Sequence, residues 1–187
     1  MRMPWCIDMI KGRITVKELC VAALLLAIAL VLGHLESLFP PPVAAIPGAK
    51  LGLANICVLL AIYALNPVCA WGIAVLKPVL SALFTASVSA VLYSLTGGIL
   101  AALAMTLLHK NKRFSVVGVS IAGAVCFNIG QMLVAVCVLS MRVAPLLPWL
   151  LLLSIPAGLI VGICVKFCMQ YLPTKLLAKK AKNEYIK

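Results

Sequence analysis

The sequence PGAKLGLANI, residues 47–56, lies where a proline-rich break ends and a new hydrophobic run begins. It places Lys50 and Asn55 at the first turns of a helix that we expect from Leu51 onward. A helix start has backbone N–H groups without intrahelical partners and a partial positive charge, so a lysine beside it favours anion binding. In a segment that enters a lipid bilayer, this pattern is typical of solute capture rather than of soluble-enzyme chemistry.

The composition of the chain indicates a membrane protein. Hydrophobic residues make up 65% of the 187 residues, charged residues make up 11%, and the mean hydropathy is +1.19. A soluble domain of this size needs more polar residues to cover its surface. The apolar runs are long and continuous rather than alternating, which favours helices over a closed β-barrel. We therefore predict one all-α integral membrane domain over residues 1–187.

Proline, glycine and polar breaks divide this domain into six predicted transmembrane helices. Thr15 and Glu18 have the spacing of a capping box, which predicts the start of the first helix. The second helix is short for a full crossing of about 20 residues, and short spans after Pro/Gly breaks point to binding sites in transporters. The predicted helices, followed by a basic tail at 173–187, cover about 15–38, 51–65, 68–85, 91–108, 114–140 and 146–172.

The formal net charge of +12 does not indicate a nucleic-acid partner. Most of the sixteen Lys and Arg residues gather in N-terminal, central and C-terminal blocks, which six helices would place on one side of a membrane. Basic loops stay on the cytoplasmic side. We therefore expect both termini in the cytoplasm and a multi-pass protein of a bacterial plasma membrane. The basic tail fits either a solvated end or an attraction to anionic lipid headgroups.

Polar side chains within the apolar runs are the candidate binding residues, because a charged group in a bilayer costs about 2.5–3.5 kcal/mol on insertion scales. Each also has a structural interpretation. The lysines and the carboxylate fit interfacial anchors or an internal ion pair, the amides fit interhelical hydrogen bonds, and the tyrosine fits an interfacial aromatic. The predicted substrate-binding set is Glu36, Lys50, Asn55, Lys77, Tyr93, Asn128 and Gln131.

No pattern of catalytic, metal-binding or cofactor-binding residues is found. The phosphate-binding loop motif, the His-Glu-x-x-His motif and a membrane carboxylate pair are all missing from the sequence. Three of the four acidic residues, Asp8, Glu18 and Glu184, lie near the ends of the chain, so no Asp-rich motif can hold a metal–diphosphate. The eight cysteines lack a completing His or carboxylate, and we interpret them as small buried apolar residues. We predict a non-enzymatic chain, so any ATP-driven step requires another subunit.

Four segments carry a resemblance to a known family. They are LESLFP at 35–40, the PGAKLGLANI segment, LYSLTGG at 92–98 and NIGQ at 128–131. They resemble the Gx transporter family, which is also labelled heptaprenyl diphosphate synthase component I, and the resemblance covers nearly the whole chain. It implies the substrate-binding S component of an energy-coupling factor (ECF) transporter, with six helices and one site near the external face for a small micronutrient-like solute.

The same resemblance implies partners. An ECF S component works with a transmembrane coupling subunit and two cytoplasmic ATPases, and a small-residue pair on the first helix contacts the coupling subunit. Ala23 and Ala27 fit that pair, and their spacing by itself allows the close approach of another helix. We expect the pocket between segment 39–50, the connection at 86–92 and the fourth to sixth helices.

Two alternatives remain open. The synthase label suggests a membrane accessory subunit of prenyl diphosphate or quinone synthesis, which would act only beside a soluble catalytic partner. A self-sufficient carrier or channel is the third interpretation.

Overall fold

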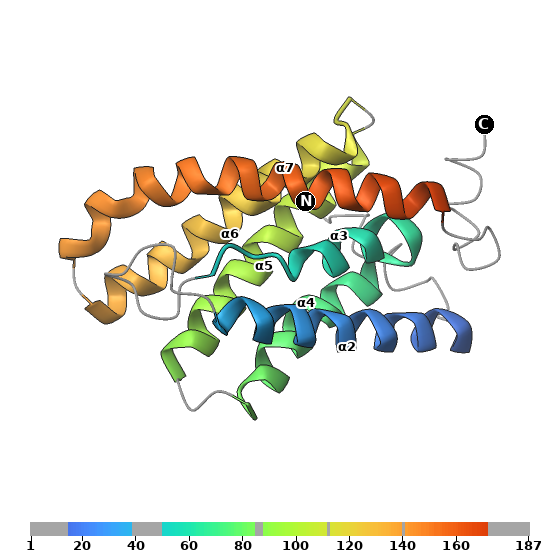
Figure 1. Ribbon diagram of the computed structural model, residues 1–187, viewed down its shortest axis with the longest axis horizontal. Helices are drawn as coiled ribbons and strands as arrows, with labels where there is room; N and C mark the ends of the chain where they lie inside the picture. Colours follow the sequence, from blue (N-terminus) through green and yellow to red (C-terminus); the bar gives the residue numbers. More distant parts are fainter. Residues whose placement is uncertain (1–14, 39–49, 85–87, 112, 140, 172–187) are drawn as a thin grey trace, which may run out of the picture.

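A computed structural model describes residues 15–38, 50–84, 88–111, 113–139 and 141–171. These residues form helices and short connections and contain no strand, which confirms the all-α prediction for this part of the chain. Figure 1 shows the arrangement, with α2 and α7 at opposite sides and α5 and α6 crossing obliquely between them. The elements are α2 (Val16–Leu38), α3 (Asn55–Ala64), α4 (Pro67–Ser81), α5 (Val88–Lys110), α6 (Val116–Leu139), the 3₁₀ helix η1 (Met141–Leu146) and α7 (Leu147–Tyr171).

Among the described residues, four stretches are long and apolar enough to cross a membrane, namely α2, α5, α6 and η1 together with α7. The helices α3 and α4 are apolar but shorter, at 10 and 15 residues. Large apolar side chains are exposed on the outer faces, with Leu24, Leu152 and Phe167 each more than half exposed. Such a surface is unfavourable in water and suits the hydrocarbon of a bilayer. The chain is a multi-pass membrane protein.

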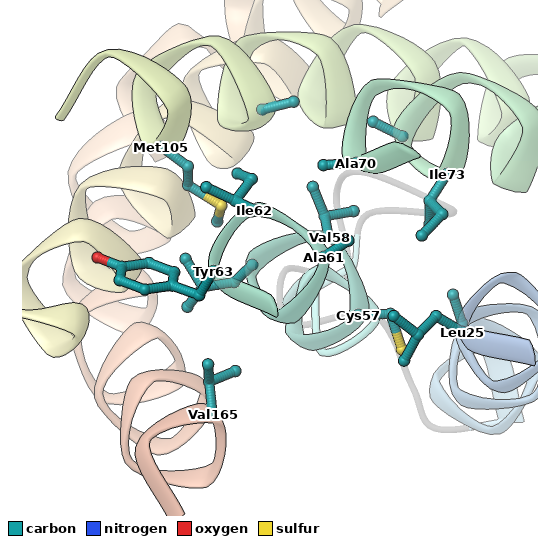
Figure 2. Packing of buried hydrophobic residues seen from close by; sticks show 14 of the residues in the cluster. Leu25, Cys57, Val58, Ala61, Ile62, Tyr63, Ala70, Ile73, Met105 and Val165 are labelled. Carbon is teal, nitrogen blue, oxygen red and sulfur yellow. The ribbon is translucent and has the colours of Figure 1, made fainter. Parts of the chain in front are cut away.

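The core of the bundle is built around α3. Eight of its ten residues are buried, as expected for a helix that is apolar on all sides. Figure 2 shows the α3 residues Val58, Ala61 and Ile62 packed among side chains of the surrounding helices. Those neighbours include Leu25 of α2, Ile73 of α4, Met105 of α5 and Val165 of α7. The short helix is therefore enclosed by its own chain over most of its surface.

Glycines bring α5, α6 and α7 almost into backbone contact. A Cβ added at Gly130 of α6 would lie 2.7 Å from the Cα of Gly97 on α5. A Cβ added at Gly158 or Gly162 of α7 would lie 2.7 Å or 2.8 Å from a Cα of α6. Small residues at membrane helix contacts permit this approach, which holds the three helices as one layer.

The predicted capping box is confirmed at the start of α2. The backbone N–H of Thr15 donates to Glu18 Oε2 at 3.0 Å, and the N–H of Glu18 donates to Thr15 Oγ1 at 3.2 Å. These reciprocal bonds satisfy two of the backbone donors that a helix start leaves free.

Three predicted boundaries are wrong by three or four residues. The second helix begins at Asn55 rather than at Leu51, because Gly52 adopts φ +86°, a conformation that ends any continuous helix. The third predicted helix ends at Ser81 rather than at 85, and α5 begins at Val88 rather than at 91. The connection predicted at 86–92 is therefore helical from residue 88.

The burial predicted for the cysteines is only partly correct. Cys57 and Cys69 are buried, whereas Cys20, Cys137 and Cys168 are exposed. A thiol behaves as a small apolar group, so a lipid-facing position needs no polar partner. All seven cysteines in the described ranges are free thiols.

Candidate solute-binding site

Polar side chains gather at the end of the bundle where α2, α4 and α6 end and α5 begins. The members that belong to α2, α4, α5 and α6 lie about 3–17 Å along their helices from that end, at 1.5 Å per residue. Each is at least nine-tenths buried. We call this set the polar cluster; it consists of Glu36, Lys50, Asn55, Lys77, Ser94, Asn128 and Gln131. Six of the seven were predicted from the sequence, and Ser94 was not.

The two lysines of the cluster converge on Gly33 of α2. The ammonium of Lys50 donates to the Gly33 carbonyl at 3.3 Å. A Cβ added at Gly33 would lie 3.0 Å from Cε and 3.3 Å from Nζ of Lys77. The Cβ and carbonyl oxygen of one residue are about 3 Å apart, so the two ammonium groups are at most about 10 Å apart. Lys77 Nζ also donates to Ser94 Oγ at 3.2 Å, which is how the missed serine joins the cluster.

Glu36 is held by backbone rather than by a lysine. Its Oε1 accepts the N–H of Gly52 at 2.7 Å, while its Oε2 is buried without a hydrogen-bond partner. Within the described ranges neither Lys50 nor Lys77 forms a direct ion pair with this carboxylate, although its charge acts on both at longer range. The interpretation of the lysines and this carboxylate as an internal ion pair therefore has no direct contact behind it among the described residues.

Gln131 joins α6 to the start of the chain segment that leads into α3. Its Oε1 accepts the N–H of Lys50 at 2.9 Å, and its Nε2 donates to the carbonyl of Lys50 at 2.7 Å. Both hydrogen bonds are buried. The side-chain amide of Gln131 therefore pairs with both the N–H and the carbonyl of Lys50. The ammonium of Lys50 extends toward Gly33 instead. In this arrangement Gln131 positions Lys50.

Several backbone donors near the start of α3 are already used within the chain. The backbone N–H groups of Asn55, Ile56 and Cys57 already donate to carbonyls three residues earlier, at 2.9–3.2 Å. The N–H of Gly52 is taken by Glu36. These four donors are therefore not available to an anion, and the side chains of Lys50 and Lys77 carry the formal positive charge at this end. The predicted anion site at the helix start stays a prediction.

Unsatisfied polar atoms concentrate in the cluster. Among the described residues, five buried side-chain atoms have no hydrogen-bond partner, and three of them are Glu36 Oε2, Asn55 Nδ2 and Asn128 Oδ1. The other two, Trp71 Nε1 and Ser120 Oγ, lie outside it. A buried polar group without a partner costs about 1–3 kcal/mol, so such groups need an explanation. Three of them in one cluster fit a site whose remaining partners belong to a ligand.

The charges of the cluster are unbalanced. It contains two lysines and one carboxylate, and Glu18, the other acidic residue in the described ranges, lies 18 residues before Glu36, about 27 Å along α2. Two ammonium groups at most about 10 Å apart repel by roughly 1.7 kcal/mol or more at an effective dielectric constant of 20. An anion about 4 Å from each would gain about 4 kcal/mol per lysine at the same dielectric constant. Glu36 offsets only one of the two positive charges.

Tyr93 lies in a separate apolar cluster. It is buried among Met132, Ala135, Val143 and Leu150, which come from α6, η1 and α7. Its predicted role in substrate binding stays a prediction. Segment 39–49, which was expected to border the pocket, lies outside the described residues.

Ala23 and Ala27 lie on an exposed face of α2, next to the exposed Leu24 and Ile28. None of the described helices covers this face. A small-residue pair there leaves room for a helix of another subunit. The role of the two alanines as a partner interface stays a prediction.

Comparison with known proteins identifies a matching family. The family model described as heptaprenyl diphosphate synthase component I matches residues 25–168. No curated protein and no solved structure matches the chain significantly. The matched range includes every residue of the polar cluster and extends over more than half of the chain.

Proposed function

The chain belongs to the heptaprenyl diphosphate synthase component I family, and we propose that it is the substrate-binding S component of an ECF-type importer. In this proposal the polar cluster captures a small, micronutrient-like solute. A transmembrane coupling subunit and two cytoplasmic ATPases then drive its release into the cell. The observation that carries the proposal is the group of three buried, unpartnered polar atoms, on Glu36, Asn55 and Asn128.

The charge distribution supports this direction of transport. Four of the described basic residues, Lys17, Lys110, Arg113 and Lys166, lie at the end of the bundle opposite the polar cluster, whereas Arg142 of η1 lies at the same end as the cluster. Basic residues favour the cytoplasmic side of a membrane. The majority of these charges therefore supports an orientation with the cluster toward the external face, where an imported solute arrives.

The exposed face around Ala23 and Ala27 supplies a docking surface for the coupling subunit in this proposal. It lies on the first half of α2, away from Gly33 and Glu36. Solute and coupling subunit would therefore contact the same helix at different levels, so a rigid-body tilt of the S component can carry the loaded site across the membrane.

The proposal is tested by the partners that purify with the chain. Affinity purification of the full chain from its native membrane is expected to recover a membrane coupling subunit and two ATPases. The purified complex in lipid vesicles is then expected to accumulate solute only with ATP. Recovery of the chain without any ATPase, together with uptake that does not need ATP, would contradict the proposal.

A second candidate is a membrane accessory subunit of prenyl diphosphate or quinone synthesis. The family description favours it, and two buried lysines suit the binding of a diphosphate group. In this case the chain should purify with a soluble prenyl synthase and raise its rate of product formation. ATP-dependent uptake without any synthase in the complex would exclude this candidate.

A further inference from the structure

We infer that the solute captured at the polar cluster is an anion whose acid group binds between Lys50 and Lys77 and which also donates a hydrogen bond to Glu36. This inference rests on the proposed function and names the chemical class of its solute. The shared chemistry is a carboxylate or phosphate group, whether it belongs to a water-soluble metabolite or to a lipid headgroup.

The net positive charge of the polar cluster indicates the chemical class of the solute. Lys50 and Lys77 both lie over Gly33, and Glu36 is the one carboxylate of the cluster. A neutral solute would leave a buried positive charge uncompensated, and a cationic solute would add a like charge to it. An acid group between the two ammonium groups balances the site, because each lysine keeps free N–H donors beyond its single hydrogen bond to Gly33 or Ser94.

The unpartnered atoms define what else the solute carries. Asn55 Nδ2 is a donor without an acceptor, and Glu36 Oε2 is an acceptor without a donor. Both flank Gly52, since its N–H reaches Glu36 Oε1 at 2.7 Å and a Cβ added there would lie 2.9 Å from Asn55 Nδ2. An oxygen of the acid group satisfies the amide of Asn55, and a neighbouring O–H or N–H of the solute satisfies Glu36. The solute therefore pairs an acid group with a hydrogen-bond donor a few atoms away.

The experiment uses the purified full chain in mild detergent and three probes prepared from a cell extract. The aqueous extract is separated on a strong anion exchanger into a retained, anionic fraction and a flow-through fraction, and the lipids form the third. The thermal midpoint of the protein is measured with each probe. We expect an upward shift with the anionic fraction and none with the flow-through.

Lys50→Met and Lys77→Met remove one ammonium group each, and Lys166→Met is the matched control on the exposed surface of α7. Each cluster variant should require at least about tenfold more of the anionic fraction for the same rise in thermal midpoint. The reason is that losing one hydrogen bond to a charged group weakens binding by about that factor. The control should match the wild type. The Lys50 variant keeps its backbone bonds to Gln131, so it stays informative if Lys77→Met does not fold.

Stabilisation by the flow-through alone, by no fraction, or equally in wild type and both lysine variants would overturn the inference. The proposed function would survive each of these results if the chain still purifies with a coupling subunit and ATPases. Stabilisation by lipids alone, lost in the lysine variants, would uphold the acid-group chemistry and contradict capture of a water-soluble solute.

Discussion

The pairing of Gln131 with the backbone of Lys50 is the contact for which the loss of stability on mutation can be derived most directly. Gln131→Leu keeps a side chain of similar size but removes two buried hydrogen bonds of 2.9 Å and 2.7 Å. Each neutral bond contributes about 1 kcal/mol, and the buried N–H and carbonyl of Lys50 left unpaired add part of their desolvation cost. We therefore expect the free energy of unfolding to fall by about 2–4 kcal/mol.

The assay is reversible unfolding of the purified chain in mixed micelles, with denaturing detergent as the variable and circular dichroism as the signal. Lys50→Met is the matched comparison, because it removes the ammonium and keeps both backbone bonds. It should lose less stability than Gln131→Leu, since the buried charge it removes has no direct ion pair. A Gln131→Leu protein as stable as the wild type would refute the idea that this amide holds the segment before α3.

Three further perturbations test other parts of the account. Gly130→Ala should lower the free energy of unfolding by about 1–3 kcal/mol in the same assay, because its Cβ would lie 2.7 Å from Gly97 Cα. Gly72→Ala is the control, since a Cβ there would meet nothing within 4 Å, and it should raise the free energy of unfolding by roughly 0.5–1 kcal/mol. Similar effects of the two substitutions would contradict the close α5–α6 contact. Thr15→Ala should weaken the first turn of α2 by about 1 kcal/mol, seen as faster amide hydrogen exchange there, and unchanged exchange would argue against the capping box. Ala23→Leu should leave solute binding intact and lower recovery of the coupling subunit; full recovery would remove this face from the interface.

Features that depend on neighbouring residues were predictable from the sequence. The capping box of Thr15 and Glu18 formed as expected, since both bonds lie within one turn. The order and approximate extent of six helices followed from apolar runs and proline breaks. The six charged and amide residues predicted for the site proved to be buried, because a bilayer leaves few other places for them, whereas Lys166 near the end of α7 is exposed.

Features that depend on distant residues were not predictable. The start of α3 is displaced to Asn55 because Gly52 turns to meet Glu36, 16 residues earlier in the chain. The bonds that hold Lys50 come from Gln131, 81 residues away. Ser94 was missed because a serine in a membrane helix commonly bonds to its own helix, and only the fold brings it to Lys77.

The central claim is that the polar cluster holds a solute, and native mass spectrometry of the full chain released from detergent tests it most directly. The account predicts a second peak for the wild type, heavier than the protein by the mass of one small molecule. That peak should be lost in Lys77→Met and kept in Lys166→Met. A wild-type spectrum without added mass, or an added mass that persists unchanged in Lys77→Met, would contradict the account.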